Sequence, residues 1–252
     1  MHGGGFALVS NDDASRPVLG YSREGIFDPD GDLPCGLKWY LDALDESFKE
    51  IGVNGYEWTP VGIRPDEREK PLVEPLLETD WYQGTPFNDW CPTYVDEAGN
   101  MKHHFVGCGA TATSQVMFYH RHPSVGRGEM TYQYDPKQVF YETDPLEENM
   151  VTLSCRFDTV YFDWSAMQAQ YQNKRSANET ANREVARLCR AVGIAMKMNY
   201  TETSGSGSNT YNATLALRRH FGYSTDTRYL ARSNYADQLW VHCLFNELSH
   251  GR

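Results

Sequence analysis

The sequence lacks several features that would define its class at once. No apolar run in the 252 residues approaches the roughly 20 residues that cross a bilayer, so no membrane-spanning helix is expected. Basic residues form no long run, and 34 acidic residues outnumber 23 basic ones, giving a formal net charge of −11. This balance argues against a surface that binds nucleic acid through its phosphates.

Closely spaced cysteine pairs are also absent. The six cysteines contain no Cys-x-x-Cys, and they stand at Cys35, Cys91, Cys108, Cys155, Cys189 and Cys243. In a chain of this length, such spacing predicts neither a disulfide framework nor a zinc ribbon. The first residues, Met1 to Gly5, lack a basic region followed by an apolar one, so they do not form a signal peptide. We expect most of the thiols to be buried as small apolar side chains.

The composition is that of a globular chain, with 40% hydrophobic and 13% aromatic residues. Apolar residues that recur every three or four positions predict helices, which we place at 37–51, 108–120, 180–196, 212–221 and 236–248. Short apolar runs at 6–10 and 17–21 flank a polar turn and predict a hairpin. Strands are also expected within 129–162, for example at 130–134.

Two polar segments divide the chain. Residues 58–71 are charged and contain proline, which is typical of an exposed linker open to proteases. We therefore place a domain boundary there, between residues 1–70 and 71–252. The stretch 72–107 is expected to be rich in loops. The Ser/Gly run 203–208 cannot pack a core, so it predicts a flexible or ligand-facing loop.

Cys108 is the candidate nucleophile. It follows Gly107, which allows a tight turn, and it opens the helix predicted over 108–120. Unpaired backbone N–H groups and the helix dipole at such a position favour a thiolate over a thiol. The Cys108 N–H could also stabilise an oxyanion. The alternative from the residues alone is an inert, buried cysteine at a helix start.

Gln83 is the second candidate, in the segment Trp81-Tyr82-Gln83-Gly84-Thr85-Pro86-Phe87-Asn88. A glutamine amide near a reactive thiol can donate a hydrogen bond to an oxyanion, because it is neutral and does not compete as a base. Gly84 and Pro86 would fix the loop that presents it. The alternative is an ordinary turn with a solvated glutamine.

Together, the segments 83–88 and 107–123 resemble the streptopain family of papain-like cysteine peptidases. The second segment reads GCGATATSQVMFYHRHP, and it departs from the family where Gly109 replaces a bulkier residue. The resemblance implies an α+β papain-like core, incomplete at its C-terminus, that is preceded by part of an α+β prodomain. Residues 1–70 would be a partial inhibitory prodomain and linker, and residues 71–252 the N-terminal part of the peptidase domain.

The resemblance also implies site roles and partners. Cys108 would be the nucleophile and Gln83 part of the oxyanion hole, and the substrate pocket would include Tyr200, Ser204, Gly205 and Ser206. The substrates would be proteins or peptides. The enzyme would be made by a bacterium as a zymogen and would be secreted or displayed at the cell surface. Neither a cofactor nor a metal is implied.

No histidine has a convincing setting as the base. The family's Gly-His-Ala and Trp-Gly-Trp segments are not among these residues, so we expect a truncated, inactive chain that self-associates through exposed core. His120 would lie about 18 Å along the helix from Cys108. A metal site of His103, His104, Cys108 and His120 fits no standard zinc spacing. The alternative function is a non-catalytic, prodomain-like inhibitor or binding protein of a related protease.

Overall fold

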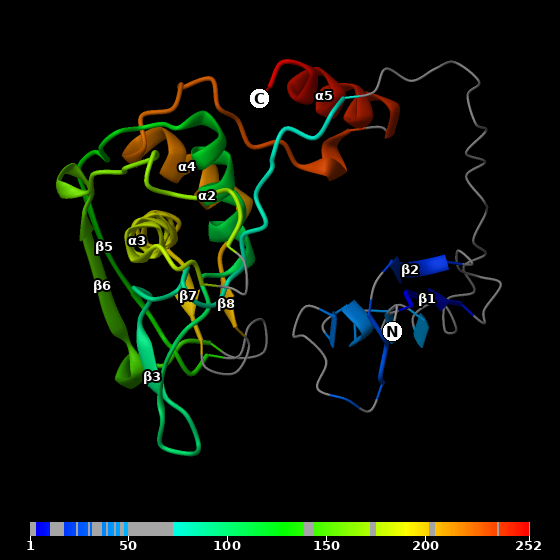
Figure 1. The fold of residues 1–252 in the computed structure, drawn as a ribbon, viewed down its shortest axis with the longest axis horizontal. Helices are drawn as coiled ribbons and strands as arrows, with labels where there is room; N and C mark the ends of the chain where they lie inside the picture. Colours follow the sequence, from blue (N-terminus) through cyan, green and yellow to red (C-terminus); the bar gives the residue numbers. More distant parts are fainter. Residues whose placement is uncertain are drawn as a thin grey trace. The chain divides into compact units, whose positions relative to one another are not determined.

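The computed structural model describes two compact units, Met1–Pro71 and Leu72–Arg252. Most of the second unit is described, and the described residues are 4–10, 18–23, 25–29, 31, 37–38, 40–42, 44–45, 48–49, 73–138, 144–171, 175–201, 205–235 and 237–251. Figure 1 labels the helices and strands of both units.

The first unit contains the hairpin predicted from the two apolar runs. Strand β1 (Phe6–Val9) pairs antiparallel with β2 (Val18–Ser22), with Phe6 opposite Ser22. The described residues between 37 and 49 are helical, which agrees with the predicted helix. The hydroxyl of Tyr40 donates a hydrogen bond to the carbonyl of Leu19 at 2.6 Å and so ties this helix to β2. Gly52 and the predicted linker 58–71 lie outside the described residues.

The second unit mixes helices with short antiparallel strand pairs. The helices are α2 (Cys108–His120), α3 (Glu179–Ala195), α4 (Thr210–His220) and α5 (Asp237–Ser249). The strand pairs are β3 (Thr93–Val95) with β4 (Met101–His103), β5 (Glu129–Tyr134) with β6 (Val151–Arg156), and β7 (Asn199–Tyr200) with β8 (Ser206–Gly207). Single 3₁₀ turns occupy Glu147–Asn149, Phe157–Thr159 and Arg232–Asn234. The α+β class and the four helices predicted here are confirmed.

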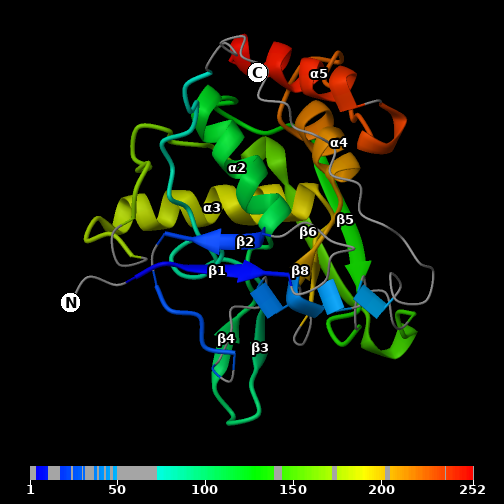
Figure 2. The ribbon, with the colours of Figure 1, turned by 90° about the vertical axis from the view of Figure 1, so that its right-hand side faces the viewer.

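Helix α3 is the centre of the core in this unit. Asn178 caps it by accepting hydrogen bonds from the N–H groups of Thr180 and Ala181. Its predicted apolar face is buried, at Val185, Leu188, Cys189 and Val192. Figure 1 views α3 almost along its axis, with α2 and α4 on one side and the β5–β6 pair on the other. Figure 2 shows the length of α3 behind α2. No helix among the described residues has both the length and the apolar character needed to span a membrane.

Two segments predicted as loops contain strands. The loop-rich stretch 72–107 holds the β3–β4 hairpin, whose turn is fixed by Asp96. The Asp96 carboxylate accepts hydrogen bonds from the N–H groups of Ala98 and Asn100 and pairs with Lys102 at 2.8 Å. An acidic residue and Gly99 beside a β-branched strand end are the sequence signal for such a turn. The Ser/Gly run contains β8, because Ser206 and Gly207 pair antiparallel with Tyr200 and Asn199 of β7.

Candidate active site

Cys108 is the first residue of α2, and its side chain is exposed. Gly107 precedes it with φ 89° and ψ 136°, a backbone conformation that turns the chain sharply into the helix. Helix geometry leaves the N–H of Cys108 without an acceptor inside the helix. A thiol and a free donor therefore stand together at the positive end of the α2 dipole.

The other described cysteines have different surroundings. Cys91, Cys155 and Cys189 are buried, as predicted, and Cys243 is half-buried. Burial raises the pKa of the Cys91 thiol to about 12, and it also raises the pKa of Cys155 and of Cys189. These three thiols stay protonated near neutral pH, so they do not compete with Cys108 as nucleophiles. Cys35 lies outside the described residues.

Gln83 lies beside the segment that leads into Cys108. Its carbonyl accepts a hydrogen bond from the N–H of Val106 at 3.0 Å, two residues before the cysteine. The Gln83 side chain is half-buried, and Gly84 and Pro86 next to it are buried. The fold therefore brings together two segments that are about 25 residues apart in the chain.

The loop that carries Gln83 is anchored on both of its flanks. Phe87 is buried and meets Tyr171 edge to face, with ring centroids 5.0 Å apart. The Asp89 carboxylate accepts from the Thr85 hydroxyl at 2.6 Å and pairs with Arg175 at 2.6 Å. Apolar packing from one side and an ion pair from the other fix the loop, which favours a preorganised Gln83.

The predicted substrate-pocket residues separate in the structure. Ser206 lies against the start of α2. Its carbonyl oxygen is so near Gly107 that a Cβ atom added to this glycine would be 2.8 Å from it. Gly205 is half-buried next to it, and Ser204 lies outside the described residues. The Tyr200 side chain is fully buried and packs on the Tyr134 ring, with centroids 5.9 Å apart. Its predicted contact with substrate is not supported by this position in the core.

No histidine in the described part of the chain hydrogen-bonds to Cys108. His103 bonds instead to the Cys91 carbonyl, His104 to that of Thr201, His220 to that of Arg127 and His250 to that of Asn246. His120 lies at the far end of α2. Across the described ranges, no three His, Cys, Asp or Glu side chains cluster as metal ligands would.

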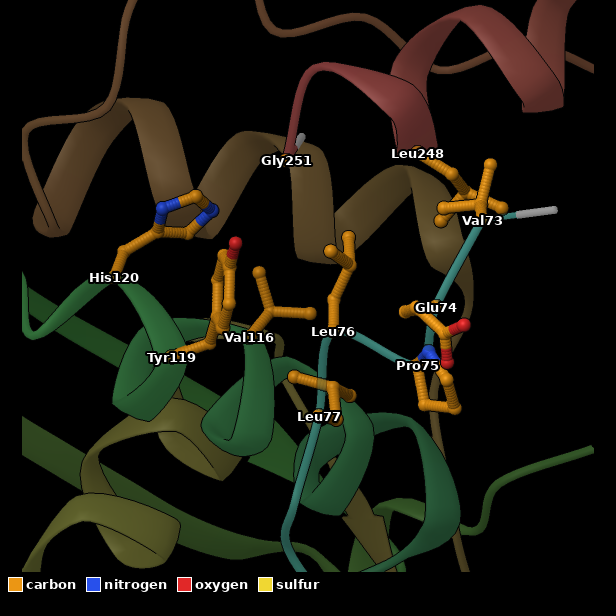
Figure 3. Close-up of a pocket in the computed structure, with 10 residues that line it drawn as sticks. All are labelled: Val73, Glu74, Pro75, Leu76, Leu77, Val116, Tyr119, His120, Leu248 and Gly251. Carbon is orange, nitrogen blue, oxygen red and sulfur yellow. The ribbon is translucent and has the colours of Figure 1, made fainter. Parts of the chain in front are cut away.

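A cavity of about 360 Å³ lies at the opposite end of α2 from Cys108 (Figure 3). Its walls are mostly apolar and comprise Val73, Glu74, Pro75, Leu76, Leu77, Val116, Tyr119, His120, Leu248 and Gly251. Partial burial, and then the neighbouring His122, lower the pKa of His120, so its ring is neutral near pH 7. Val116 to His120 are about 12 to 18 Å along the helix from Cys108, so this cavity is separate from the thiol.

A mixed α+β core in which a helix begins with an exposed cysteine agrees with a papain-like cysteine peptidase fold. The model of the peptidase C10 family matches residues 81–252, and a model described as Spi protease inhibitor matches residues 1–48. The chain belongs to the peptidase C10 family, which confirms the predicted resemblance.

Named relatives and solved structures agree with this assignment. Streptopain of Streptococcus pyogenes is 28% identical over 259 aligned positions, which cover 99% of this chain and 61% of streptopain. The thiol protease/hemagglutinin PrtT of Porphyromonas gingivalis is 27% identical over 98% of this chain and 28% of its own. The chain therefore spans about three fifths of the length of the streptopains that it matches.

Two structures of Prevotella intermedia proteins share the fold. A fragment of prointerpain A superposes with a TM-score of 0.68 and 28% identity, covering 97% of this chain and 71% of that one. The active interpain A cysteine protease gives a TM-score of 0.59 and 32% identity, covering 71% of this chain and 66% of its own.

Proposed function

We propose that residues 71–252 carry the nucleophile of a cysteine endopeptidase and that residues 1–70 are part of its inhibitory prodomain. The observation that carries this proposal is the exposed thiol of Cys108 at the start of α2, with Gln83 bonded to the segment that precedes it. The Spi protease inhibitor match over residues 1–48 supports the prodomain. By similarity to the streptopains, the substrates are proteins or peptides, and the zymogen is secreted or displayed at the cell surface. Self-association stays a prediction.

The chemistry begins with attack of the Cys108 thiolate on a peptide carbonyl. A C–S bond forms and the carbonyl π electrons move to oxygen, where the Cys108 N–H and the Gln83 amide donate hydrogen bonds. Collapse of this intermediate breaks the C–N bond and releases an amine, which must receive a proton. Water then hydrolyses the thioester.

The proton transfers in this sequence require a base, which in papain-like sites is a histidine. In the part of the chain that the structure describes, no histidine hydrogen-bonds to the thiol. We therefore expect these 252 residues alone to give little or no turnover of a substrate such as azocasein. The covalent step has to be tested without turnover.

We expect iodoacetamide to alkylate Cys108 well before Cys91, Cys155 or Cys189, because those thiols are buried and protonated. A peptide aldehyde forms a hemithioacetal with a thiol at the same site, so it should protect Cys108 from alkylation. Peptide mapping by mass spectrometry measures both effects, and Cys108→Ala is the matched control. If alkylation at Cys108 is no faster than at Cys189 in the folded protein, or the aldehyde does not protect it, the proposal fails.

A second function, inhibition of a related protease in trans, is favoured by the inhibitor match at residues 1–48. We expect a peptide of residues 1–70 to inhibit a complete streptopain-like enzyme. The measurement is the initial rate of peptide hydrolysis against inhibitor concentration. A scrambled peptide of the same composition is the control, and no inhibition at micromolar concentration would remove this function.

A further inference from the structure

Asn88 joins the loop that carries Gln83 to the segment that leads into Cys108. Its side chain is buried, with 8% of its surface exposed. The side-chain amide donates to the carbonyl of His104 at 3.1 Å and to that of His103 at 3.4 Å. The bond to His104 is buried and the bond to His103 is partly buried, and both come from the one Asn88 amide, which carries two N–H donors.

These bonds join one end of segment 83–88 to segment 103–106. At the other end, the N–H of Val106 donates to the carbonyl of Gln83 at 3.0 Å. Residues 83–88 are thereby bonded to residues 103–106 at both ends, and Cys108 follows two residues later. A shift of either segment would move Gln83 relative to the Cys108 N–H.

Asn88 is itself fixed by its own backbone. Its N–H donates to the carbonyl of Gly84 at 3.3 Å, and its carbonyl accepts from the N–H of Cys91 at 2.9 Å. The side chain therefore projects from a closed turn rather than from a free loop. Only a short side chain with two N–H donors can reach both carbonyls from this position.

We propose that Asn88 is a positioning residue that fixes the position of the two oxyanion donors, the Gln83 amide and the Cys108 N–H, relative to each other. This inference rests on the proposed function for its chemical meaning, since the donors matter only if an oxyanion forms. The structural part is independent: Asn88 maintains the bond between Val106 and Gln83.

The first experiment measures amide hydrogen exchange in the full chain. In Asn88→Asp, which keeps the shape but loses both donors when ionised, exchange at the Val106 amide should rise at least about tenfold. The matched control is Trp164→Phe, which removes another buried bond, from Nε1 to the Pro123 carbonyl at 2.8 Å, beyond the other end of α2. Asn88→Ala is the second variant should Asn88→Asp fail to fold. A Val106 rate in the Asn88 variants equal to that of Trp164→Phe would overturn the positioning role.

The second experiment separates positioning from general damage at the thiol. A peptide aldehyde generates an oxyanion-like adduct, whereas alkylation by iodoacetamide does not. We expect Asn88→Asp to weaken aldehyde binding about 10- to 100-fold and to leave the alkylation rate of Cys108 within about twofold. Unchanged aldehyde affinity together with faster Val106 exchange would overturn the link to the oxyanion donors. If the unmodified chain binds no aldehyde, the proposed function fails. The exchange result still decides whether Asn88 maintains the hydrogen bond between Val106 and Gln83.

Discussion

Gly193→Ala is expected to destabilise the second unit strongly. The Cβ atom would fall on the hydroxyl of Tyr200, and neither group can move aside, because the Tyr200 side chain and the α3 residues on both sides of Gly193 are buried. Overpacking of this kind costs about 3 kcal/mol of unfolding free energy, or more where the clash involves a rigid ring. Urea denaturation followed by tryptophan fluorescence measures the change.

Gly109→Ala is the matched control for this prediction. It also adds one methyl group to a helical glycine, but the nearest atom is the Met196 terminal methyl, 3.3 Å away, at the end of a flexible side chain. We expect a change between zero and a gain of about 1 kcal/mol, since alanine is the better helix former. Equal effects of the two substitutions would contradict the packing of Tyr200 against Gly193.

Gly107→Ala is expected to disable the site at Cys108. The glycine has φ 89°, and an added Cβ would lie 2.8 Å from the Ser206 carbonyl oxygen and 2.9 Å from the Met198 sulfur. Backbone strain and overlap together should cost about 2 to 4 kcal/mol of unfolding free energy. Displacement of the first turn of α2 should lower the affinity of the peptide aldehyde about 100-fold. Competition with iodoacetamide at Cys108 measures this affinity.

Gly128→Ala separates the effect of backbone strain from the effect of atomic overlap. Gly128 also has a positive φ, 66°, but no atom lies within 4 Å of its added Cβ. We expect a loss of about 1 kcal/mol from backbone strain alone and no change in aldehyde affinity. If Gly128→Ala lowers the affinity as much as Gly107→Ala does, overlap at the site is not the cause.

The sequence predicted the helices of the second unit well because their apolar residues recur with the helical period. The four buried positions of α3 illustrate this, as the same stripe that defines the helix also faces the core. Short strands were harder to predict. The β3–β4 pair depends on side-chain bonds to Asp96, and β8 depends on partners in β7, so neither shows a long period-two pattern.

The candidate site was predictable only in part. Cys108 and Gln83 stand out because glycine and small residues surround them in segments that resemble one family. Asn88 is also in that segment, but nothing in the sequence indicates which carbonyls its amide meets. Tyr200 is the reverse case. The family resemblance placed it in the substrate pocket, whereas its side chain is enclosed by the core.

The sequence by itself determined the family, the helix that begins at Cys108 and the identity of the two residues proposed for the oxyanion chemistry. Local patterns and helix termini are properties of neighbouring residues, so they can be recognised without a fold. The tertiary structure alone decided that Gln83 lies beside Val106 and that the Asn88 side chain bonds to the segment before Cys108. It also decided that Cys108 is exposed while Cys91, Cys155 and Cys189 are buried. Those facts depend on contacts between residues far apart in the chain, and packing of the whole unit sets them.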